Sequence, residues 1–403
     1  MTSFGEFVRA AQAEGRLVVQ PRMGMSDPVA MRAGLLATRA AAATTVGTIT
    51  VDSYTRVGDN SGAALALARG SALNGYPITA HDTRTTRRVL HGLRFPVQVR
   101  HGSAVPGDIV SALIAAGMHA TEGGPASYCL PYSRLPLRDS VENWSRACAR
   151  LAELGEHTHL ESFGGCMMGQ LCPPSVLVAI SVLEALFFRQ HGLRSISLSY
   201  AQQTNPVQDY EAVAGLTSLA AEFLSDVDWH VVIYAYMGVF PRTPRGARRV
   251  LAEAARLAVR TGSARLIVKT VAEAHRIPTV AENVAALEHA GSAAELFSAQ
   301  PVDGTASETY AEARALVQAV LDLDSDIGIA LDKGFSAGYL DVPFCLHPDN
   351  AGRARSYLDT NGWLRWSHTG SLPIAGRAGQ RRDMSSSELL AALSYMERLC
   401  DTN

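Results

Sequence analysis

Three arginine residues each follow a short apolar run that reads as a buried β-strand. Arg22 ends the run LVVQPR, Arg56 ends TITVDSYTR and Arg100 ends FPVQVR. A guanidinium group is always charged and suits a core poorly, whereas its planar fork matches the two oxygens of a carboxylate or phosphate. If the three strands lie side by side in a parallel sheet or barrel, the arginines converge at one edge. The pattern therefore predicts a site for a small molecule with more than one carboxylate or phosphate.

Other polar residues stand at similar positions. His101 directly follows Arg100. Glu122 lies in TEGGPASYCLPY, and Tyr128 and Tyr132 follow it in the same segment. One strand-end arginine is more often a structural salt bridge, but three of them beside a histidine favour a ligand site. The Glu122 carboxylate and the tyrosine hydroxyls could bind an ammonium group. Two half-buried tyrosines with solvated hydroxyls would give the same pattern.

Lys269 ends the strongly apolar run RLIVK, and Glu273 follows one helical turn later. A lysine at a strand end can form a Schiff base with a carbonyl substrate. It can equally donate to a cofactor or pair with Glu273 for structural reasons. The sequence alone leaves these three roles open.

Strand-like and helical stretches alternate along the first 270 residues, which predicts parallel strands joined by right-handed helical crossovers. About eight repeats favour an α/β fold of the (β/α)₈, TIM-barrel-like type. Nine runs are one more than a barrel needs, and the short runs at 76–80 and 159–164 are the candidates to lie outside it. The strand-like runs are 16–21, 45–54, 76–80, 95–101, 119–123, 159–164, 195–200, 229–236 and 265–270.

The alternation stops near residue 290. We expect a catalytic barrel over residues 1–290 and a C-terminal extension over 291–403 that does not fold on its own. The extension should contain one helix at about 306–323 and a final helix near 386–400. It should pack on the barrel, across one end, as a cap or a partner surface.

Composition limits the classes of function. The chain has 403 residues, 47% hydrophobic content and a net charge of −2, so general attraction to nucleic acid or to anionic membranes is not expected. It lacks a signal-peptide pattern and an uninterrupted apolar run of membrane-spanning length, and we expect a cytoplasmic protein. Six cysteines without a CxxC pair predict buried, reduced thiols, and no residue spacing indicates a metal site. No GxGxxG or GxxxxGK[ST] pattern follows a strand.

The motifs together resemble a known family. QPRMG, DSYTR, LNGYP, VRHG, TEGGPASYCLPY and IVKTVAEAHRIPT occur in the same order in the large, epsilon, subunit of glutamate mutase (methylaspartate mutase). The resemblance runs from about residue 17 to about residue 344 and continues more weakly through DNAGRARSYLDTNGWLRW. It implies a (β/α)₈ barrel that holds L-glutamate against adenosylcobalamin during a radical rearrangement to L-threo-3-methylaspartate.

The resemblance also implies roles for individual residues, position by position. The arginines would clasp the substrate carboxylates, and Glu122 would meet the substrate amino group as the catalytic residue. The implied substrate-binding residues are Arg22, Arg56, Arg100, His101, Glu122, Tyr128 and Tyr132. The implied cofactor-binding residues are Gly24, Asn74, Pro131, Phe240, Lys269, Glu273 and Ile277.

A partner is implied as well. Cobalamin enzymes of this type carry a DxHxxG segment whose histidine binds the cobalt, and this sequence has none; Asp228-Trp229-His230 continues with Val-Val-Ile. In the family a separate small sigma subunit supplies the segment, so this chain should be active only with such a partner. A homodimer of this chain within a heterotetramer is expected.

Three other functions remain open at this point. One is a Schiff-base lyase that uses Lys269, and another is a binding or regulatory protein that kept the fold, although the complete set of polar residues argues against it. A third is a mutase of the same class with a different amino-acid substrate. The local sequence Phe163-Gly164-Gly165-Cys166 departs from the family and leaves room for this last possibility.

Overall fold

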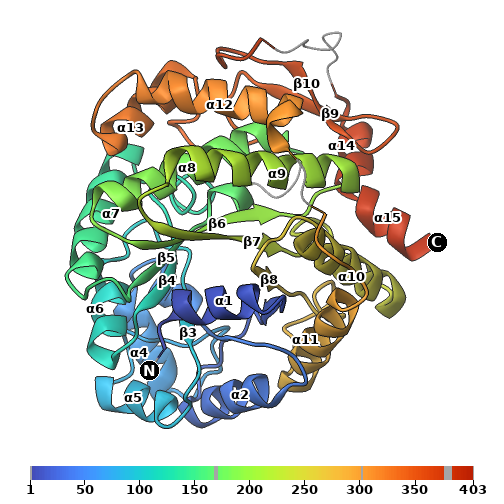
Figure 1. Cartoon of the computed structure of the whole chain (residues 1–403). Helices are drawn as coiled ribbons and strands as arrows, with labels where there is room; N and C mark the ends of the chain where they lie inside the picture. The colour runs from blue at the N-terminus through green and yellow to red at the C-terminus, as the bar shows by residue number, and fades with distance from the viewer. Residues whose placement is uncertain (1, 168–170, 301–302, 376–383, 403) are drawn as a thin grey trace.

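Eight parallel strands form the centre of the molecule. The computed structural model describes residues 2–167, 171–300, 303–375 and 384–402 (Figure 1). The strands are hydrogen-bonded in the order β1-β8-β7-β6-β5-β4-β3-β2. A parallel bridge between Val19 and Thr45 joins β1 to the start of β2 and closes the sheet into a barrel. The strands are β1 Val18–Gln20, β2 Gly47–Thr50, β3 Val97–Arg100, β4 Ala120–Gly123, β5 His159–Ser162, β6 Ser195–Ala201, β7 Asp228–Tyr234 and β8 Arg265–Ile267.

Helices connect successive strands and surround the barrel (Figure 1). The predicted (β/α)₈ fold is therefore confirmed. The helices of the barrel are α2 Pro28–Ala40, α3 Ser53–Arg56, α4 Asn60–Ala68, α5 Thr83–Leu90, α6 Gly107–Ala116, α7 Leu137–Ala152, α8 Pro174–Gln190, α9 Pro206–Phe223, α10 Pro244–Arg260 and α11 Val280–Ala294.

Of the two short candidate strands, only one belongs to the barrel. The run at 159–164 contains β5, whereas the run at 76–80 lies outside the barrel, as one of the two candidates was expected to, and it forms no strand. Tyr76 makes a single parallel bridge to Val51, beyond the end of β2, and the segment continues as turns towards α5. Tyr76 is fully buried, and its hydroxyl lies 2.9 Å from Thr86 Oγ1. The apolar pattern here reflects packing between a loop and a helix.

Local signals set the helix boundaries. Asp27 caps α2 by accepting a hydrogen bond from Ala30 N at 2.7 Å, and Pro28 fills the first turn, where no backbone donor is needed. Pro174 similarly opens α8, which is buried along residues 174–188. A helix that is apolar all round must be covered on all sides. This one lies between the barrel wall and a further layer of helices.

The first helix, α1 (Phe4–Ala13), covers the amino-terminal end of the barrel. Its Phe4 ring stacks on His159, the first residue of β5, with ring centroids 5.0 Å apart. A Cβ atom at Gly5 would lie 2.3 Å from Ser195 Oγ, so glycine is needed for this close approach. The opposite, carboxyl-terminal end of the barrel is where ligand sites occur in this fold.

The C-terminal extension packs on the barrel, mainly along its outer wall. Helix α12 (Glu308–Leu321) lies on α8 and α9, and α13 (Ile327–Ala337) lies on α7 and α8 (Figure 1). The hairpin of β9 (Arg355–Leu358) and β10 (Leu364–His368) follows. A loop of the extension also reaches the start of α7, after the β4 loop, where Asp349 accepts a hydrogen bond from Leu137 N at 2.6 Å. The extension is thus a second layer that touches one rim.

The last helix differs from the prediction in its continuity. The expected helix near 386–400 is two short helices, α14 (Ser386–Leu393) and α15 (Tyr395–Thr402), and α15 packs on α10. Met396 and Cys400 lie in a small apolar cluster with Tyr236 and Phe240. The break follows from the different surfaces on which the two halves pack.

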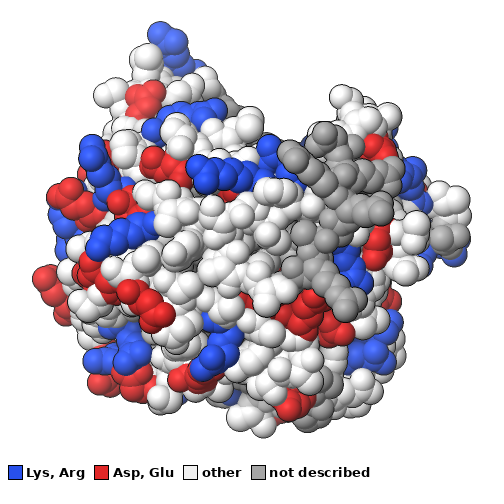
Figure 2. Space-filling model, turned by 90° about the horizontal axis from the view of Figure 1, so that it is seen from above, with Lys and Arg blue, Asp and Glu red and all other residues white. Residues whose placement is uncertain are grey.

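The surface and the cysteines fit the composition. Within the described residues, no helix combines the length and the apolar character needed to cross a membrane. Basic and acidic side chains alternate on the face formed by the extension (Figure 2).

All six cysteines are buried and free, as the sequence predicts. Burial raises the pKa of the Cys148 and Cys172 thiols well above the usual value.

Candidate active site

The three arginines reach the carboxyl-terminal end of the barrel from three consecutive βα segments. Arg100 is the last residue of β3, and Arg22 follows β1 by two residues. Arg56 differs from the expectation, because it ends the one-turn helix α3 instead of a strand. Asp52 starts that turn by accepting hydrogen bonds from Tyr54 N at 2.8 Å and Thr55 N at 3.2 Å. A buried aspartate cap therefore places Arg56 beside the barrel mouth.

Most of the predicted residues line one cavity of about 700 Å³ at this end of the barrel. None of the described residues beyond 290 contributes to its lining. The predicted residues that line it are Arg22, Gly24, Arg56, Asn74, Arg100, His101, Glu122, Tyr128, Tyr132, Glu273 and Ile277.

The other three predicted residues lie outside the lining. Lys269 Nζ is 4.0 Å from Glu273 Oε2, so Lys269 adjoins the cavity through Glu273, and Nζ is 5.0 Å from the centre of the Phe240 ring. Pro131 is half-buried in the turn between the two predicted tyrosines. A role for these three at the cofactor remains a prediction.

The floor of the cavity contains a buried ion pair between Arg100 and Glu122. Arg100 Nε donates to Glu122 Oε2 at 2.6 Å, and the two side chains are 6% and 2% exposed. Burial alone lowers the pKa of Arg100, but Glu122 outweighs it and holds that pKa well above the usual value. Nε donates to Glu122 and Nη2 to the Tyr234 hydroxyl at 3.3 Å, which leaves the hydrogens of Nη1 and the second hydrogen of Nη2 for a ligand carboxylate.

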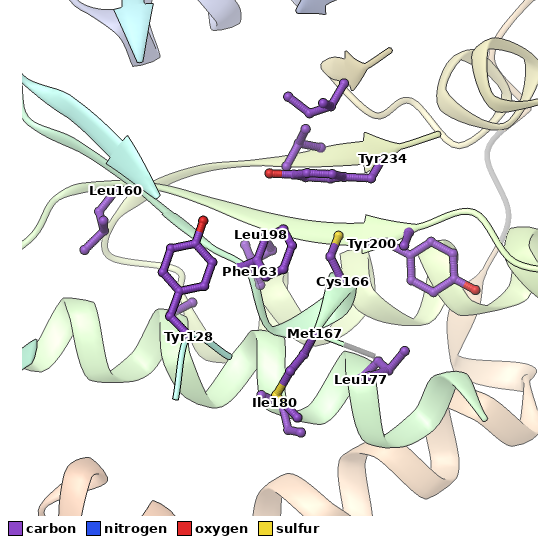
Figure 3. Packing of buried hydrophobic residues seen from close by; sticks show 14 of the residues in the cluster. Tyr128, Leu160, Phe163, Cys166, Met167, Leu177, Ile180, Leu198, Tyr200 and Tyr234 are labelled. Carbon is purple, nitrogen blue, oxygen red and sulfur yellow. The ribbon is translucent and has the colours of Figure 1, made fainter. Parts of the chain in front are cut away.

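Aromatic rings form one wall. The Tyr128 hydroxyl donates to Glu122 Oε1, and its ring lies edge-on to Tyr132 with centroids 5.9 Å apart. The Phe163 ring is 5.2 Å from Tyr128 and lines the same cavity (Figure 3). The Arg56 guanidinium lies 5.9 Å from the Tyr132 ring centre. The wall thus combines apolar surface with hydroxyls directed at charged groups.

His101 contributes a neutral donor. Burial lowers the pKa of His101 to about 3, so the ring is uncharged at physiological pH. Its Nδ1 accepts a hydrogen bond from Ser103 N at 3.1 Å, which leaves the ring hydrogen on Nε2. Among the described residues Nε2 has no hydrogen-bond partner although it is buried. A ligand oxygen in the cavity would satisfy it.

The loop that follows Glu122 is held in place by Glu184, a residue that the sequence analysis did not select. Glu184, on α8, accepts hydrogen bonds from Ala126 N at 3.1 Å and Ser127 N at 2.8 Å. A Cβ atom at Gly124, where φ is 159°, would lie 2.1 Å from this carboxylate. A Cβ atom at Gly123 would likewise lie 2.3 Å from the Trp144 ring, so the double glycine of the EGG motif admits Trp144 and the Glu184 carboxylate.

A polar column inside the barrel was also missed. Tyr234 contacts Glu122 from β7, and behind it Glu161 of β5 pairs with Arg265 of β8, both fully buried. In sequence these residues stand within apolar strands, where a tyrosine or a single charged residue is indistinguishable from packing. Only the pairing of strands around the barrel brings them together.

Lys269 has an altered acidity. Burial, together with the charge of Arg22, lowers the pKa of Lys269 to about 8, against the opposing effect of Glu273. A larger share of the amine is therefore unprotonated near neutral pH than for an exposed lysine. Within the described ranges, no three His, Cys, Asp or Glu residues lie together in a group that could hold a metal ion.

Comparison with known proteins gives a consistent result. The family model for the methylaspartate mutase E chain matches residues 1–389. The glutamate mutase epsilon subunit of Halobacterium salinarum is 34% identical over 81% of this chain and 71% of its own length. That of Yersinia enterocolitica is 32% identical over 81% and 72%, and that of Haloarcula marismortui is 32% identical over 83% and 73%. The motifs at the barrel mouth, the barrel itself and these matches identify the chain as a member of the methylaspartate mutase E chain family.

Proposed function

We propose that this chain is the substrate-binding catalytic subunit of a glutamate mutase, which interconverts L-glutamate and L-threo-3-methylaspartate. The observation that carries the proposal is the joint lining of one cavity by three arginines and a buried glutamate. A substrate with two carboxylates and one ammonium group has the complementary charges.

Each group of the substrate has a counterpart in the cavity. Arg22, Arg56 and Arg100 bind the two carboxylates, and Arg100 takes one of them through the Nη1 and Nη2 hydrogens that do not bond to Tyr234. Glu122 binds the ammonium group, and the neutral His101 donates from Nε2. A substrate held at both ends keeps its fragments within recombination distance during a carbon-skeleton rearrangement.

The chemistry of the cavity mouth also suits adenosylcobalamin. Ile277 and Tyr132 are 66% and 42% exposed at the lip and offer apolar surface to a flat ring system. Asn74 Oδ1 accepts from Ser53 N at 3.0 Å, which orients the amide so that its NH₂ group can donate to a ligand. When bound, adenosylcobalamin supplies the radical that abstracts a substrate hydrogen. Lys269, Glu273 and Phe240 would hold the part of the cofactor that faces their side of the mouth.

We further propose that a small cobalamin-binding subunit covers this mouth. The sequence carries no DxHxxG segment, and in this proposal the small subunit would supply the histidine that binds the cobalt. A cover is needed physically as well, because radical intermediates must be kept from water.

Reconstitution tests this proposal directly. The purified chain is mixed with adenosylcobalamin and the small subunit of a relative, and 3-methylaspartate formation is followed as the subunit ratio varies. We expect no turnover without the small subunit and activity that saturates with it. Turnover by this chain and the cofactor alone would contradict the proposed need for a small subunit. Saturable activity only with another amino acid would mean that the same chemistry has a different substrate.

One observation favours a second candidate, a Schiff-base lyase. The lowered pKa of Lys269, about 8, is a property of lysines that attack carbonyl groups. The position of Nζ beside Glu273 and Phe240, outside the cavity lining, weighs against it. A borohydride-trapped adduct on Lys269, formed with a carbonyl substrate in the absence of cobalamin, would establish the lyase.

A further inference from the structure

Tyr234, at the carboxyl end of β7, stands directly behind the Arg100–Glu122 pair. Its hydroxyl is 2.8 Å from Glu122 Oε2 and accepts a hydrogen bond from Arg100 Nη2 at 3.3 Å. The Arg100 guanidinium also lies 5.0 Å from the centre of the Tyr234 ring. Tyr234 itself is 1% exposed and does not line the cavity. It therefore acts on a ligand only through the residues that it holds.

On its other side, Tyr234 reaches a second carboxylate. Its hydroxyl is hydrogen-bonded to Glu161 Oε1, and Glu161 Oε2 is paired with Arg265. Gln98 Nε2 also donates to Glu161 Oε2, at 3.2 Å. Arg265 is in turn held by Gln20. The site thus rests on a buried column in which Tyr234 stands between two ion pairs, Arg100–Glu122 and Glu161–Arg265.

The phenol separates two buried carboxylates. Glu122 and Glu161 lie on adjacent strands as direct partners in the parallel register of β4 and β5. The hydroxyl of Tyr234 has a single hydrogen, so it donates to only one of the two carboxylates at a time. When it donates to Glu122 Oε2, at 2.8 Å, it fixes the direction of that carboxylate.

We propose that Tyr234 is a positioning residue that keeps the Glu122 carboxylate directed at the amino group of the substrate. The inference rests on the proposed function and deepens it, because it assigns recognition of the amino group to a residue outside the cavity. The carboxylates are bound by the arginines and depend less on this support.

A matched pair of variants isolates the effect. Tyr234→Phe removes the bridging hydroxyl, whereas Tyr200→Phe removes an equally buried one on β6 that donates to Asp209 Oδ1 at 2.8 Å. The two hydroxyls point in opposite directions, with that of Tyr200 directed away from Tyr128 (Figure 3). Thermal unfolding of both variants measures how much stability is lost when a buried tyrosine hydroxyl is removed.

The ligands L-glutamate and glutarate, which lacks the amino group, are titrated calorimetrically into the full-length chain. We expect Tyr234→Phe to weaken L-glutamate binding about tenfold or more, as for loss of a hydrogen bond to a charged group, and to change glutarate binding less than about threefold. Tyr200→Phe should change neither. Unchanged L-glutamate affinity in Tyr234→Phe, or an equal loss for both ligands, would overturn the inference. A wild-type chain that binds neither ligand would overturn the proposed substrate, and this inference with it.

Discussion

The guanidinium group of Arg100 faces a protein partner on one side and the cavity on the other. Its Nε binds Glu122 inside the barrel, and its outer edge faces the cavity. A lysine could supply the charge but only one point of contact, because an ammonium group has no planar fork. The ligand site therefore depends on the shape of this group as much as on its charge.

Arg100→Lys should lower kcat/KM of the reconstituted enzyme by about 10²-fold, roughly 2–4 kcal/mol of transition-state stabilisation. Steady-state kinetics with L-glutamate measures this. The control is Arg84→Lys on the exposed side of α5, which should leave kcat/KM unchanged. Equal and small effects at both positions would mean that Arg100 has only a structural role.

Glu122→Gln keeps the shape of the side chain and removes the charge that we propose meets the substrate ammonium. We expect kcat to fall about 10²-fold or more, while glutarate affinity falls less. Some stability should also be lost, because Arg100 loses its buried counter-ion. The matched control is Glu142→Gln, which breaks an exposed pair with Arg146 and should be silent. Normal turnover by the folded fraction of Glu122→Gln would show that Glu122 is only a salt-bridge partner.

At the scale of elements, the site depends on how α8 meets the loop after β4. Glu184 accepts two backbone hydrogen bonds from that loop and one each from Ser127 Oγ and Ser162 Oγ, both at 2.9 Å. No cation lies among these partners. Burial accordingly raises the pKa of Glu184 to about 7, although the hydrogen bonds oppose the change. The loop that carries Tyr128 is thus anchored to a carboxyl group that titrates near neutrality.

This anchor predicts a pH-dependent stability. The folded-state pKa lies above the unfolded value of 4.5, so the folded protein binds the proton more tightly and stability falls as pH rises from about 4.5 to about 7. Glu184→Gln stays neutral and can still accept both backbone hydrogen bonds, while the serine hydroxyls turn to accept from its amide. Relative to wild type, the variant should gain about 2 kcal/mol in free energy of unfolding between pH 5 and pH 8.

Denaturant titrations at several pH values measure the difference. Asp209, whose pKa burial also raises to about 7, is present in both proteins and cancels in the comparison. Parallel stability curves for wild type and Glu184→Gln would contradict the assignment.

At the scale of the whole molecule, the extension completes the outer layer of the barrel. Helix α8 is buried on every side only because α12 and α13 cover it. A truncated barrel would expose this apolar face to water, at a cost of about 25 cal/mol for each Å² uncovered. The extension is therefore expected to be a structural part of the barrel.

Two truncations test this expectation. A fragment of residues 1–300 should bind a hydrophobic dye and lack a cooperative thermal transition. Of the described helices and strands, a chain that ends at residue 375 loses α14 and α15. It keeps the layer over α8 and should unfold cooperatively at a lower temperature. A sharp transition for the 1–300 fragment would show that the barrel is stable alone.

The sequence by itself determined the features that depend on neighbouring residues along the chain. Alternating apolar runs indicated the strands and helices, and caps such as Asp27 with Pro28 marked helix starts, because these signals act within one turn. Residues after strands, including Arg100 and Glu122, could be assigned to one end of the barrel for a similar reason. In a parallel barrel, all strand carboxyl ends lie on the same side.

Only the tertiary structure decided which residues from distant strands meet. The burial of Tyr76 in a loop, the anchoring of the loop after β4 by Glu184, and the column of Tyr234, Glu161 and Arg265 all join segments far apart in the sequence. A buried charge is tolerated only where a partner compensates it, and that partner is set by barrel closure and strand register. The sequence near a buried charged residue does not show which residue will pair with it.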